Sequence, residues 1–210
     1  MDDLPAVLDA TNYVLVQSER PEMTMQEFRS EFCLPFKRFY DKHVPHVSLD
    51  QLEQWFHSRF AQVQDSVCAL PHAEDFLGFC RERKIRTLLL STVSHRYYEA
   101  QAGVTGFGPY IQTPYINVWD KRKKIGEILT ENQLHPAETL FIGDMEHDIE
   151  TAKHGGVRSC AVLTGYNTAD QLRAAEPDVI VEDLNELREM LSEHDMCLPP
   201  GRNGNSVVGR

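Results

Sequence analysis

The hydrophobic pattern of the chain changes near residue 70. Before that point, apolar side chains recur at helical spacing, most clearly at Leu49, Leu52, Phe56, Phe60 and Val63. Such spacing forms one apolar stripe on a helix and predicts core packing. We therefore expect an all-helical N-terminal third, with helices over the ranges 5–17, 24–32, 35–43 and 48–64. Two pairs have capping-box spacing at predicted helix starts: Thr24 with Glu27, and Ser48 with Gln51.

After Pro71, short apolar runs alternate with amphipathic helical patterns. The runs predict strands over 87–90, 111–118, 139–142, 159–163 and 179–181. The helical patterns cover 72–83, 95–102, 122–133, 146–154, 168–175 and 184–191, and the glycine-rich range 103–109 reads as a loop. This alternation predicts an α/β fold with a parallel, doubly wound sheet. We expect a helical domain over 1–69, an α/β core over 70–193 and a disordered tail over 194–210.

Composition and charge exclude several classes of partner. The 210 residues include 21 Lys and Arg against 32 Asp and Glu, a net charge of −11. This balance argues against nucleic acid or an anionic membrane as the main partner. The five cysteines are scattered without a CxxC pair, as in proteins of reducing compartments. With no signal peptide and no run long enough to span a membrane, we expect a soluble, cytoplasmic protein.

The most informative stretch runs from Thr139 to Asp148. A short apolar run meets Gly143, and then Asp144 and Asp148 follow four residues apart at the start of a predicted helix. Two carboxylates at the carboxyl edge of a sheet suit a hard cation such as Mg²⁺. The alternative is that both acids complement the dipole of the helix start.

Two other strand ends and helix starts carry polar groups. The run 87–90 is followed by Ser91 and Thr92, whose hydroxyls can hold a phosphate oxygen. Lys121 opens a predicted helix, with Lys123 and Lys124 beside it. Taken singly, Ser91 reads as an ordinary strand-end hydroxyl and the lysines as a solvated helix face. Because ligands of doubly wound sheets bind outside the carboxyl ends of the strands, these groups together predict a site for a phosphate group and its metal ion.

Three other groups of residues allow weaker interpretations. Ser94 and His95 invite a hydrolase-triad hypothesis, but no G-x-S-x-G elbow accompanies them. His147 reads as a polar residue of a first helical turn rather than as a metal ligand. Lys37 and Arg38 either face a cleft, where they would touch a substrate anion, or lie on a solvated helix face.

These motifs resemble those of the haloacid dehalogenase (HAD) superfamily, near its phosphoglycolate phosphatase-like members with a helical cap. Leu88-Leu89-Leu90-Ser91 is similar to the second motif of that family, and residues 142–148 are similar to the fourth motif. Lys121 resembles the lysine of the third motif, with Lys124 as the fallback. The resemblance implies a Rossmann-type parallel sheet flanked by helices, with an N-terminal all-helical cap.

The same resemblance implies a function and its residues. It implies Mg²⁺-dependent hydrolysis of a small phosphorylated metabolite through an aspartyl-phosphate. Ser91 and Thr92 would bind phosphate, Lys121 would neutralise charge, and Asp144 with Asp148 would hold Mg²⁺. A dehalogenase is the rival within the superfamily, but dehalogenation needs no cation, so the metal acids favour phosphate chemistry.

One departure from the family pattern concerns its first motif. That motif is a strand ending in Asp-x-Asp-x-Thr, whose first aspartate is the nucleophile, and no such strand occurs in this sequence. Asp2 and Asp3 follow no apolar run, so neither takes the nucleophile role. Loss of a middle strand would leave unpaired backbone groups, each costing about 1–3 kcal/mol. We therefore expect the sequence to start inside a longer natural chain and to be inactive alone. The alternative is a catalytically inactive, phosphate-binding or regulatory protein.

Overall fold

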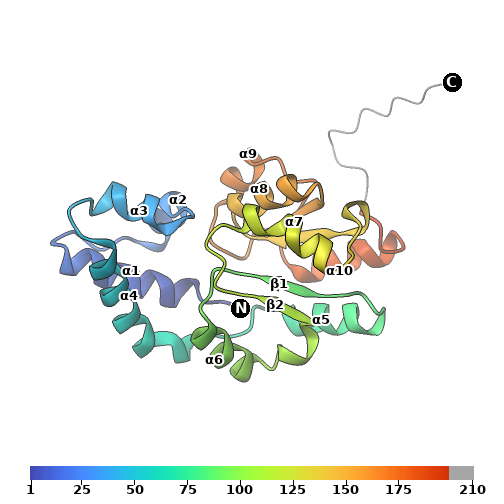
Figure 1. Ribbon diagram of the computed structural model, residues 1–210, viewed down its shortest axis with the longest axis horizontal. Coiled ribbons are helices and arrows are strands. Elements are labelled where there is room, and N and C mark those ends of the chain that lie inside the picture. The colour runs from blue at the N-terminus through green and yellow to red at the C-terminus, as the bar shows by residue number, and fades with distance from the viewer. Residues whose placement is uncertain (199–210) are drawn as a thin grey trace.

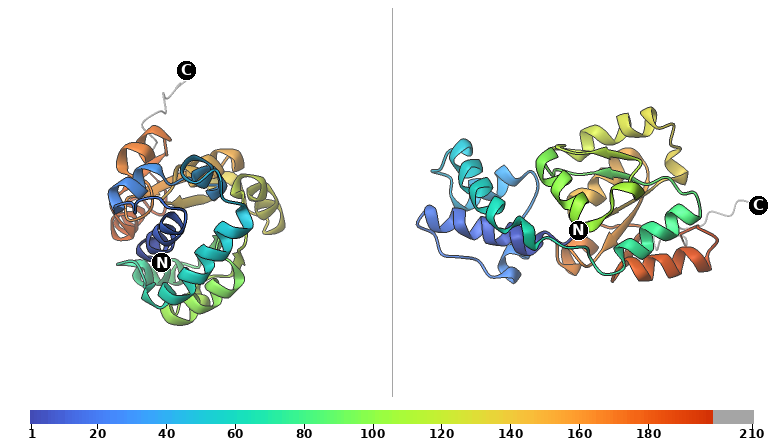
Figure 2. Two further views of the ribbon diagram at one scale, coloured as in Figure 1. Left: turned by 90° about the vertical axis from the view of Figure 1, so that its left-hand side faces the viewer. Right: turned by 90° about the horizontal axis from the view of Figure 1, so that it is seen from below.

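The regular elements of the N-terminal part of the protein are all helices. The computed structural model describes residues 1–198. Its first elements are α1 (Leu4–Gln17), α2 (Met25–Glu31), α3 (Phe36–His43), α4 (Leu49–Val63) and the 3₁₀ turn η1 (Gln64–Ser66). Figure 1 and the right-hand view of Figure 2 show these helices as a lobe beside the α/β part, with the N-terminus between the two. The prediction of an all-helical N-terminal third is confirmed.

Of the two predicted capping boxes, the one at Thr24 is confirmed, and the one at Ser48 forms only one of its two hydrogen bonds. The Thr24 hydroxyl accepts from the Glu27 N–H at 3.2 Å, and the Glu27 carboxylate accepts from the Thr24 N–H at 2.8 Å, which completes a capping box. The Ser48 hydroxyl accepts from the Gln51 N–H at 3.4 Å. The Gln51 side chain, however, bonds Gln54 at 3.2 Å and does not return to Ser48. Ser48 is therefore an N-cap without the reciprocal bond.

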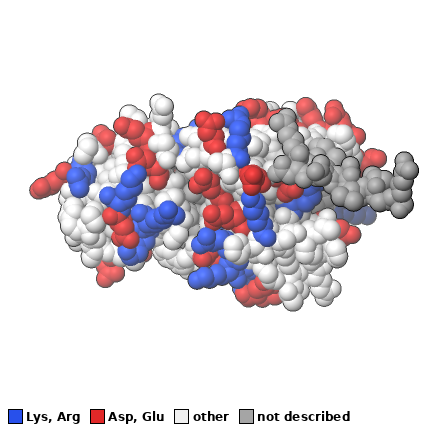
Figure 3. All heavy atoms as spheres, turned by 90° about the horizontal axis from the view of Figure 1, so that it is seen from above, with Lys and Arg blue, Asp and Glu red and all other residues white. Residues whose placement is uncertain are grey.

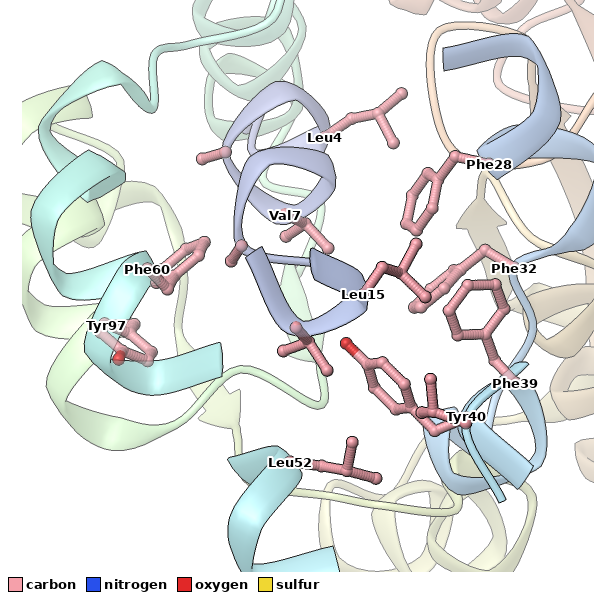
Figure 4. Close-up of a cluster of buried hydrophobic side chains, with 14 of the residues drawn as sticks. Leu4, Val7, Leu15, Phe28, Phe32, Phe39, Tyr40, Leu52, Phe60 and Tyr97 are labelled. Carbon is pink, nitrogen blue, oxygen red and sulfur yellow. The ribbon is translucent and has the colours of Figure 1, made fainter. Parts of the chain in front are cut away.

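A single buried cluster joins the helical lobe to the α/β part. Figure 4 shows α1 between the aromatic rings of α2 and α3 on one side and Phe60 and Tyr97 on the other. The predicted stripe of α4 is present but shorter than expected, because Leu52 and Phe60 are buried while Leu49 is 37% exposed. Tyr97 and Met145 belong to the α/β part, yet both pack into this cluster. The lobe is therefore docked through a continuous apolar contact.

The α/β part alternates strands and helices as expected. Its strands are β1 (Leu88–Leu90), β2 (Thr113–Tyr115), β3 (Leu140–Gly143), β4 (Arg158–Val162) and β5 (Val179–Val181). Its helices are α5 (Ala73–Glu82), α6 (His95–Thr105), α7 (Lys121–Glu131), α8 (Glu146–Gly155), α9 (Ala169–Ala174) and α10 (Leu184–Glu193). Two 3₁₀ turns complete it, η2 (Gly108–Tyr110) and η3 (Pro136–Glu138). The α/β class with an N-terminal helical cap is confirmed.

The strands pair in parallel, but those described form two sheets rather than one. β1 pairs with β2, and β3, β4 and β5 form a second sheet in that order. Figure 1 shows the β1–β2 pair apart from the strands flanked by α7, α8 and α10. Within residues 1–198, β1 and β3 each pair along one edge only. The parallel arrangement was predicted correctly, whereas its division into two sheets was not.

Three predicted boundaries differ from the structure. α6 continues through Gly103 to a left-handed Gly106, so the glycine-rich loop starts three residues later than expected. β2 covers three residues instead of 111–118, and two residues after it Asn117 adopts a positive φ of 57°, which interrupts the extended conformation. Of the tail predicted over 194–210, the range 199–210 lies outside the described residues. The remainder is partly ordered, with the Cys197 N–H bonded to the His194 carbonyl at 2.9 Å.

Candidate functional site

Two helices begin beside the carboxyl end of β3. The strand ends at Gly143, and α8 starts three residues later at Glu146. A Cβ on Gly143 would lie 2.3 Å from the Cβ of Asp148, so only glycine lets the strand end approach the first turn of α8. α7, which begins at Lys121, packs alongside α8. The sequence therefore delivers a lysine and two aspartates to one corner of the fold.

Lys121 and Asp148 form a buried ion pair. The Lys121 Nζ donates to Asp148 Oδ1 at 2.7 Å, and the two side chains are 12% and 3% exposed. The other oxygen of Asp148 accepts from the N–H groups of Asp144 and Met145, both at 3.2 Å. Both oxygens of Asp148 are thus already bonded. Lys121 has three donors, so two remain for a further anion.

Asp144 lies next to this pair and has a perturbed acidity. Its Oδ2 accepts from the Tyr166 N–H at 2.7 Å, and no bond to its Oδ1 is found in the described part of the chain. Burial, followed by the negative charge of Asp148, raises the pKa of Asp144 to about 6. The half-buried Asp144 and the buried Asp148 repel each other, and a divalent cation would relieve this repulsion. Asp144 therefore fits direct metal coordination, whereas Asp148 fits an indirect role through Lys121.

His147 completes the corner from the first turn of α8. It is 5% exposed, and its Nε2 accepts from the backbone N–H of Lys121 at 3.3 Å. Burial, with the positive charge of Lys121 adding to it, lowers the pKa of His147. The ring is therefore neutral and helps to fix the start of α7 against α8. The prediction of a polar first-turn residue understated its burial.

The structure distinguishes the two lysines proposed for the third motif. Lys124 is ion-paired with Glu127 on the outer side of α7 and lies 5.7 Å from the ring centroid of Tyr115. It makes no recorded contact with either aspartate. Lys121, not Lys124, is the lysine that meets the acids.

Ser91 and Thr92 follow β1, as expected, but no recorded bond links them to the lysine or the aspartates. The Ser91 Oγ accepts from the Val93 N–H at 3.2 Å, and the Ser91 carbonyl accepts from the Val118 N–H at 3.1 Å. Thr92 is exposed. Their phosphate-binding role stays a prediction.

The loop between β4 and α9 carries site residues that the sequence reasoning missed. Besides the bond from Tyr166 to Asp144, the Asn167 N–H donates to the Asp144 carbonyl at 3.1 Å. The Asn167 Oδ1 accepts from the Glu146 N–H at 2.7 Å. The Tyr166 hydroxyl donates to Asp3 Oδ1 at 2.9 Å, and burial raises the pKa of Asp3 despite this bond. No motif marks this loop, because its role is defined by residues more than twenty positions away.

A cavity of about 120 Å³ lies between the helical lobe and the start of α8. Arg38 lines it, together with Arg122, His147 and Glu150. Arg122 is already bonded to Asp120 at 2.9 Å and to Glu150 at 3.0 Å. Lys37, in contrast, is paired with Asp41 at 2.6 Å on an exposed face. Of Lys37 and Arg38, Arg38 is therefore the residue that lines the cavity.

Several whole-molecule properties bear on function. In residues 1–198, no group of three or more His, Cys, Asp or Glu side chains is arranged to hold a metal ion. No helix in the same range has the length and hydropathy needed to cross a membrane. The five cysteines are free thiols. Figure 3 shows basic and acidic side chains interspersed over one face, without a continuous basic patch.

Comparison with known proteins gives consistent results. The HAD-hydrolase-like family model matches residues 123–187, which include Asp144 and Asp148. A phosphoglycolate phosphatase of Synechococcus elongatus is 28% identical over 140 residues, 63% of this chain and 65% of that enzyme. The chain thus matches slightly less than two thirds of that relative. The pyrophosphatase PpaX of Oceanobacillus iheyensis is 26% identical over 200 residues, covering 88% of this chain and 92% of the relative.

Solved structures share the fold at low sequence identity. A predicted phosphatase from Clostridium acetobutylicum superposes with a TM-score of 0.80 at 14% identity, over 91% of this chain and 93% of the other. A haloacid dehalogenase-like family protein from Streptococcus pneumoniae gives 0.76 at 19% identity, over 89% and 90%. At these identities the likeness establishes the shared fold, including the helical lobe.

Proposed function

Because the chain belongs to the haloacid dehalogenase (HAD) superfamily, we propose that it carries the phosphate- and metal-binding part of a phosphatase of small phosphomonoesters that uses Mg²⁺ and an aspartyl-phosphate intermediate. The observation that carries the proposal is the buried contact of Lys121 with Asp148 beside Asp144. It combines a cation for a phosphate group with a carboxylate that is free to take a metal ion. The named relatives are phosphatases, which supports phosphate chemistry over dehalogenation.

Each residue has a stated part in this proposal. Asp144 would take Mg²⁺ through Oδ1, with further oxygens from substrate, water or a nucleophile segment. Bound there, the ion would stabilise negative charge on the phosphoryl oxygens. Lys121 would add two N–H donors to those oxygens while Asp148 holds it in place. Ser91 and Thr92 would bind the phosphate from the end of β1.

The nucleophile is not supplied by the described residues in this proposal. Within residues 1–198, β1 and β3 each keep one edge unpaired, to which a further parallel strand can pair. A strand pairing there would end at the same side as β3, since parallel strands share their direction. We propose that the attacking aspartate comes from such a strand.

Turnover tests the nucleophile part of the proposal. The 210-residue chain should show no hydrolysis of an aryl phosphate with Mg²⁺ above background. Fusing an apolar strand ending in Asp-x-Asp-x-Thr directly before Met1 should give activity, because the aspartate would then sit beside Lys121. The matched control carries Asn at the first Asp of the fused strand and should be inactive. Turnover by the unfused chain that depends on Asp3 would contradict the proposal.

Thermal unfolding tests the metal part. A ligand at a hundredfold excess over its Kd stabilises the fold by about 2.7 kcal/mol, or several degrees for a chain of this size. Mg²⁺ should therefore raise the unfolding midpoint, Asp144→Asn should abolish the rise, and Asp148→Asn should weaken it less. Glu127→Gln, on the outer face of α7, is the matched control and should keep the full rise.

Measurements without metal add a check on Asp144 itself. A folded-state pKa of about 6, above the ordinary 3.8, favours the protonated carboxyl in the fold. This stabilisation is complete below the unfolded pKa and is lost as pH rises through 6. At pH 8 the metal-free Asp144→Asn protein should therefore be at least as stable as the unmodified one. If the unfolding midpoint of Asp144→Asn rises with Mg²⁺ as much as that of the unmodified protein, the metal proposal is wrong, and Asp144 and Asp148 only complement the start of the helix.

A further inference from the structure

Arg29, on α2 of the helical lobe, contacts one loop of the α/β part through three backbone carbonyls. Its Nη2 donates to the Asn167 carbonyl at 2.9 Å and to the Leu163 carbonyl at 3.5 Å. Its Nε donates to the Tyr166 carbonyl at 3.4 Å. No carboxylate within residues 1–198 forms an ion pair with Arg29, so its partners are the loop carbonyls. A planar guanidinium can reach several carbonyls at once, which a lysine ammonium on a flexible stem cannot reproduce.

The loop that Arg29 holds is the one that wraps around Asp144. Tyr166 and Asn167 donate their N–H groups to the side chain and to the carbonyl of Asp144, respectively. A Cβ on Gly165 would lie 1.7 Å from Asp144 Oδ2, so the loop backbone is in direct contact with the carboxylate. Any shift of this loop must therefore move or release the Asp144 carboxylate.

Further contacts make α2 and this loop one unit. The Tyr166 ring lies 5.4 Å from the ring of Phe32 and 6.3 Å from that of Phe28, measured between centroids. The Gln171 side chain, just after the loop, donates to the Ser30 carbonyl at 3.1 Å. Hydrogen bonds and ring packing thus join the helical lobe to the loop on both sides of Arg29.

We infer that Arg29 is a positioning residue: it holds the 163–167 loop so that docking of the helical lobe and orientation of the Asp144 carboxylate are coupled. Only the Mg²⁺-binding role of Asp144 in this inference rests on the proposed function. When the lobe is docked, Arg29 fixes the three carbonyls and the loop presents its N–H groups to Asp144. When α2 moves away, the loop loses this support and Asp144 loses its fixed orientation.

Amide hydrogen exchange of the full chain tests the coupling without needing metal or turnover. In Arg29→Met, the amides of Tyr166 and Asn167 should exchange about tenfold faster, the change expected for loss of roughly one hydrogen bond to a charged group. Arg29→Lys should restore little of the protection, because the fork geometry is lost. Arg173→Met, an exposed arginine of α9 paired with Asp170, is the matched control and should leave both amides unchanged.

A double-mutant cycle separates positioning from general destabilisation. Asp144→Ala removes the acceptor of the Tyr166 amide, so its combination with Arg29→Met should exchange no faster than the faster single variant. Three outcomes would each overturn the inference. The two substitutions could have additive effects on exchange, the exchange rates could rise uniformly across the amides of β4 and β5, or the exchange rates of the Tyr166 and Asn167 amides could stay unchanged in Arg29→Met. If Arg29→Met does not fold, the exchange rates of the same two amides in Arg29→Lys test the inference instead.

A Mg²⁺ titration then connects the inference to the proposed function. If the unmodified protein is stabilised by Mg²⁺, Arg29→Met should weaken the apparent Mg²⁺ affinity about tenfold, since Asp144 is no longer held. Arg173→Met should keep the full affinity. Absence of any Mg²⁺ effect in the unmodified protein counts against the proposed function alone, because the exchange result still decides the role of Arg29.

Discussion

Replacing Lys121 by methionine should destabilise the protein by about 3–5 kcal/mol, the usual cost of removing one partner from a buried ion pair. The pair is well shielded, with Lys121 12% and Asp148 3% exposed. Methionine keeps most of the length of the lysine side chain, so the change removes the charge and its hydrogen bond with little loss of volume. The carboxylate of Asp148 would then stay buried with only two backbone N–H groups as partners. Urea unfolding at pH 7 measures the loss directly.

The reason for the loss is tested by a second substitution. Adding Asp148→Asn to Lys121→Met removes the unpaired charge, so the double variant should regain a substantial part of the stability. Lys124→Met is the matched control, because this lysine is paired on the outer side of the same helix and should change stability little. A loss below about 1 kcal/mol in Lys121→Met would show that the pair is solvated and that Asp148 does not depend on Lys121.

Local signals in the sequence predicted most elements of the fold. Each of the ten α-helices within residues 1–198 was expected near its observed place, because apolar periodicity and capping residues act within a few positions of one another. The Thr24–Glu27 capping box is one example. The end of α8 is another, since Gly156 adopts the left-handed conformation, with φ of 63°, that glycine tolerates best. Such features need no knowledge of the distant chain.

The candidate site could be predicted only in part, because its geometry depends on long-range contacts. The order of Ser91, Lys121, Asp144 and Asp148 along the chain indicated one edge of a parallel fold. It did not indicate that Asp148 would be bonded to Lys121 and to two backbone N–H groups. Because of these bonds, Asp148 fits an indirect role through Lys121 rather than direct coordination of a metal ion. Likewise, nothing near Tyr166 in the sequence indicates that its N–H faces Asp144, twenty-two residues earlier. The role of that loop follows only from tertiary packing.

Replacing Gly165 by alanine should destabilise the protein by about 3 kcal/mol, at the upper end of the usual cost of overpacking. The new Cβ would lie 1.7 Å from Oδ2 and 2.3 Å from the Cβ of Asp144. Rotation of the carboxylate cannot relieve the second contact, because that carbon is attached to the backbone. The loop or the end of β3 must therefore move, which breaks the bond from Tyr166 to Asp144. Chemical denaturation measures the loss, and faster exchange of the Tyr166 amide locates it.

Two further variants show whether the collision with Asp144 causes the loss. Gly126→Ala, in the exposed middle of α7 with nothing within 4 Å of its Cβ, should instead stabilise the protein by about 0.5–1 kcal/mol, because alanine favours the helix. Asp144→Gly removes the atoms that the new Cβ would meet, so Gly165→Ala should cost much less in that background. An equal cost in both backgrounds would place the strain elsewhere in the loop. A cost that disappears with Asp144→Gly would establish that the acid and the loop occupy one shared space, which is also the contact through which Arg29 would orient the carboxylate.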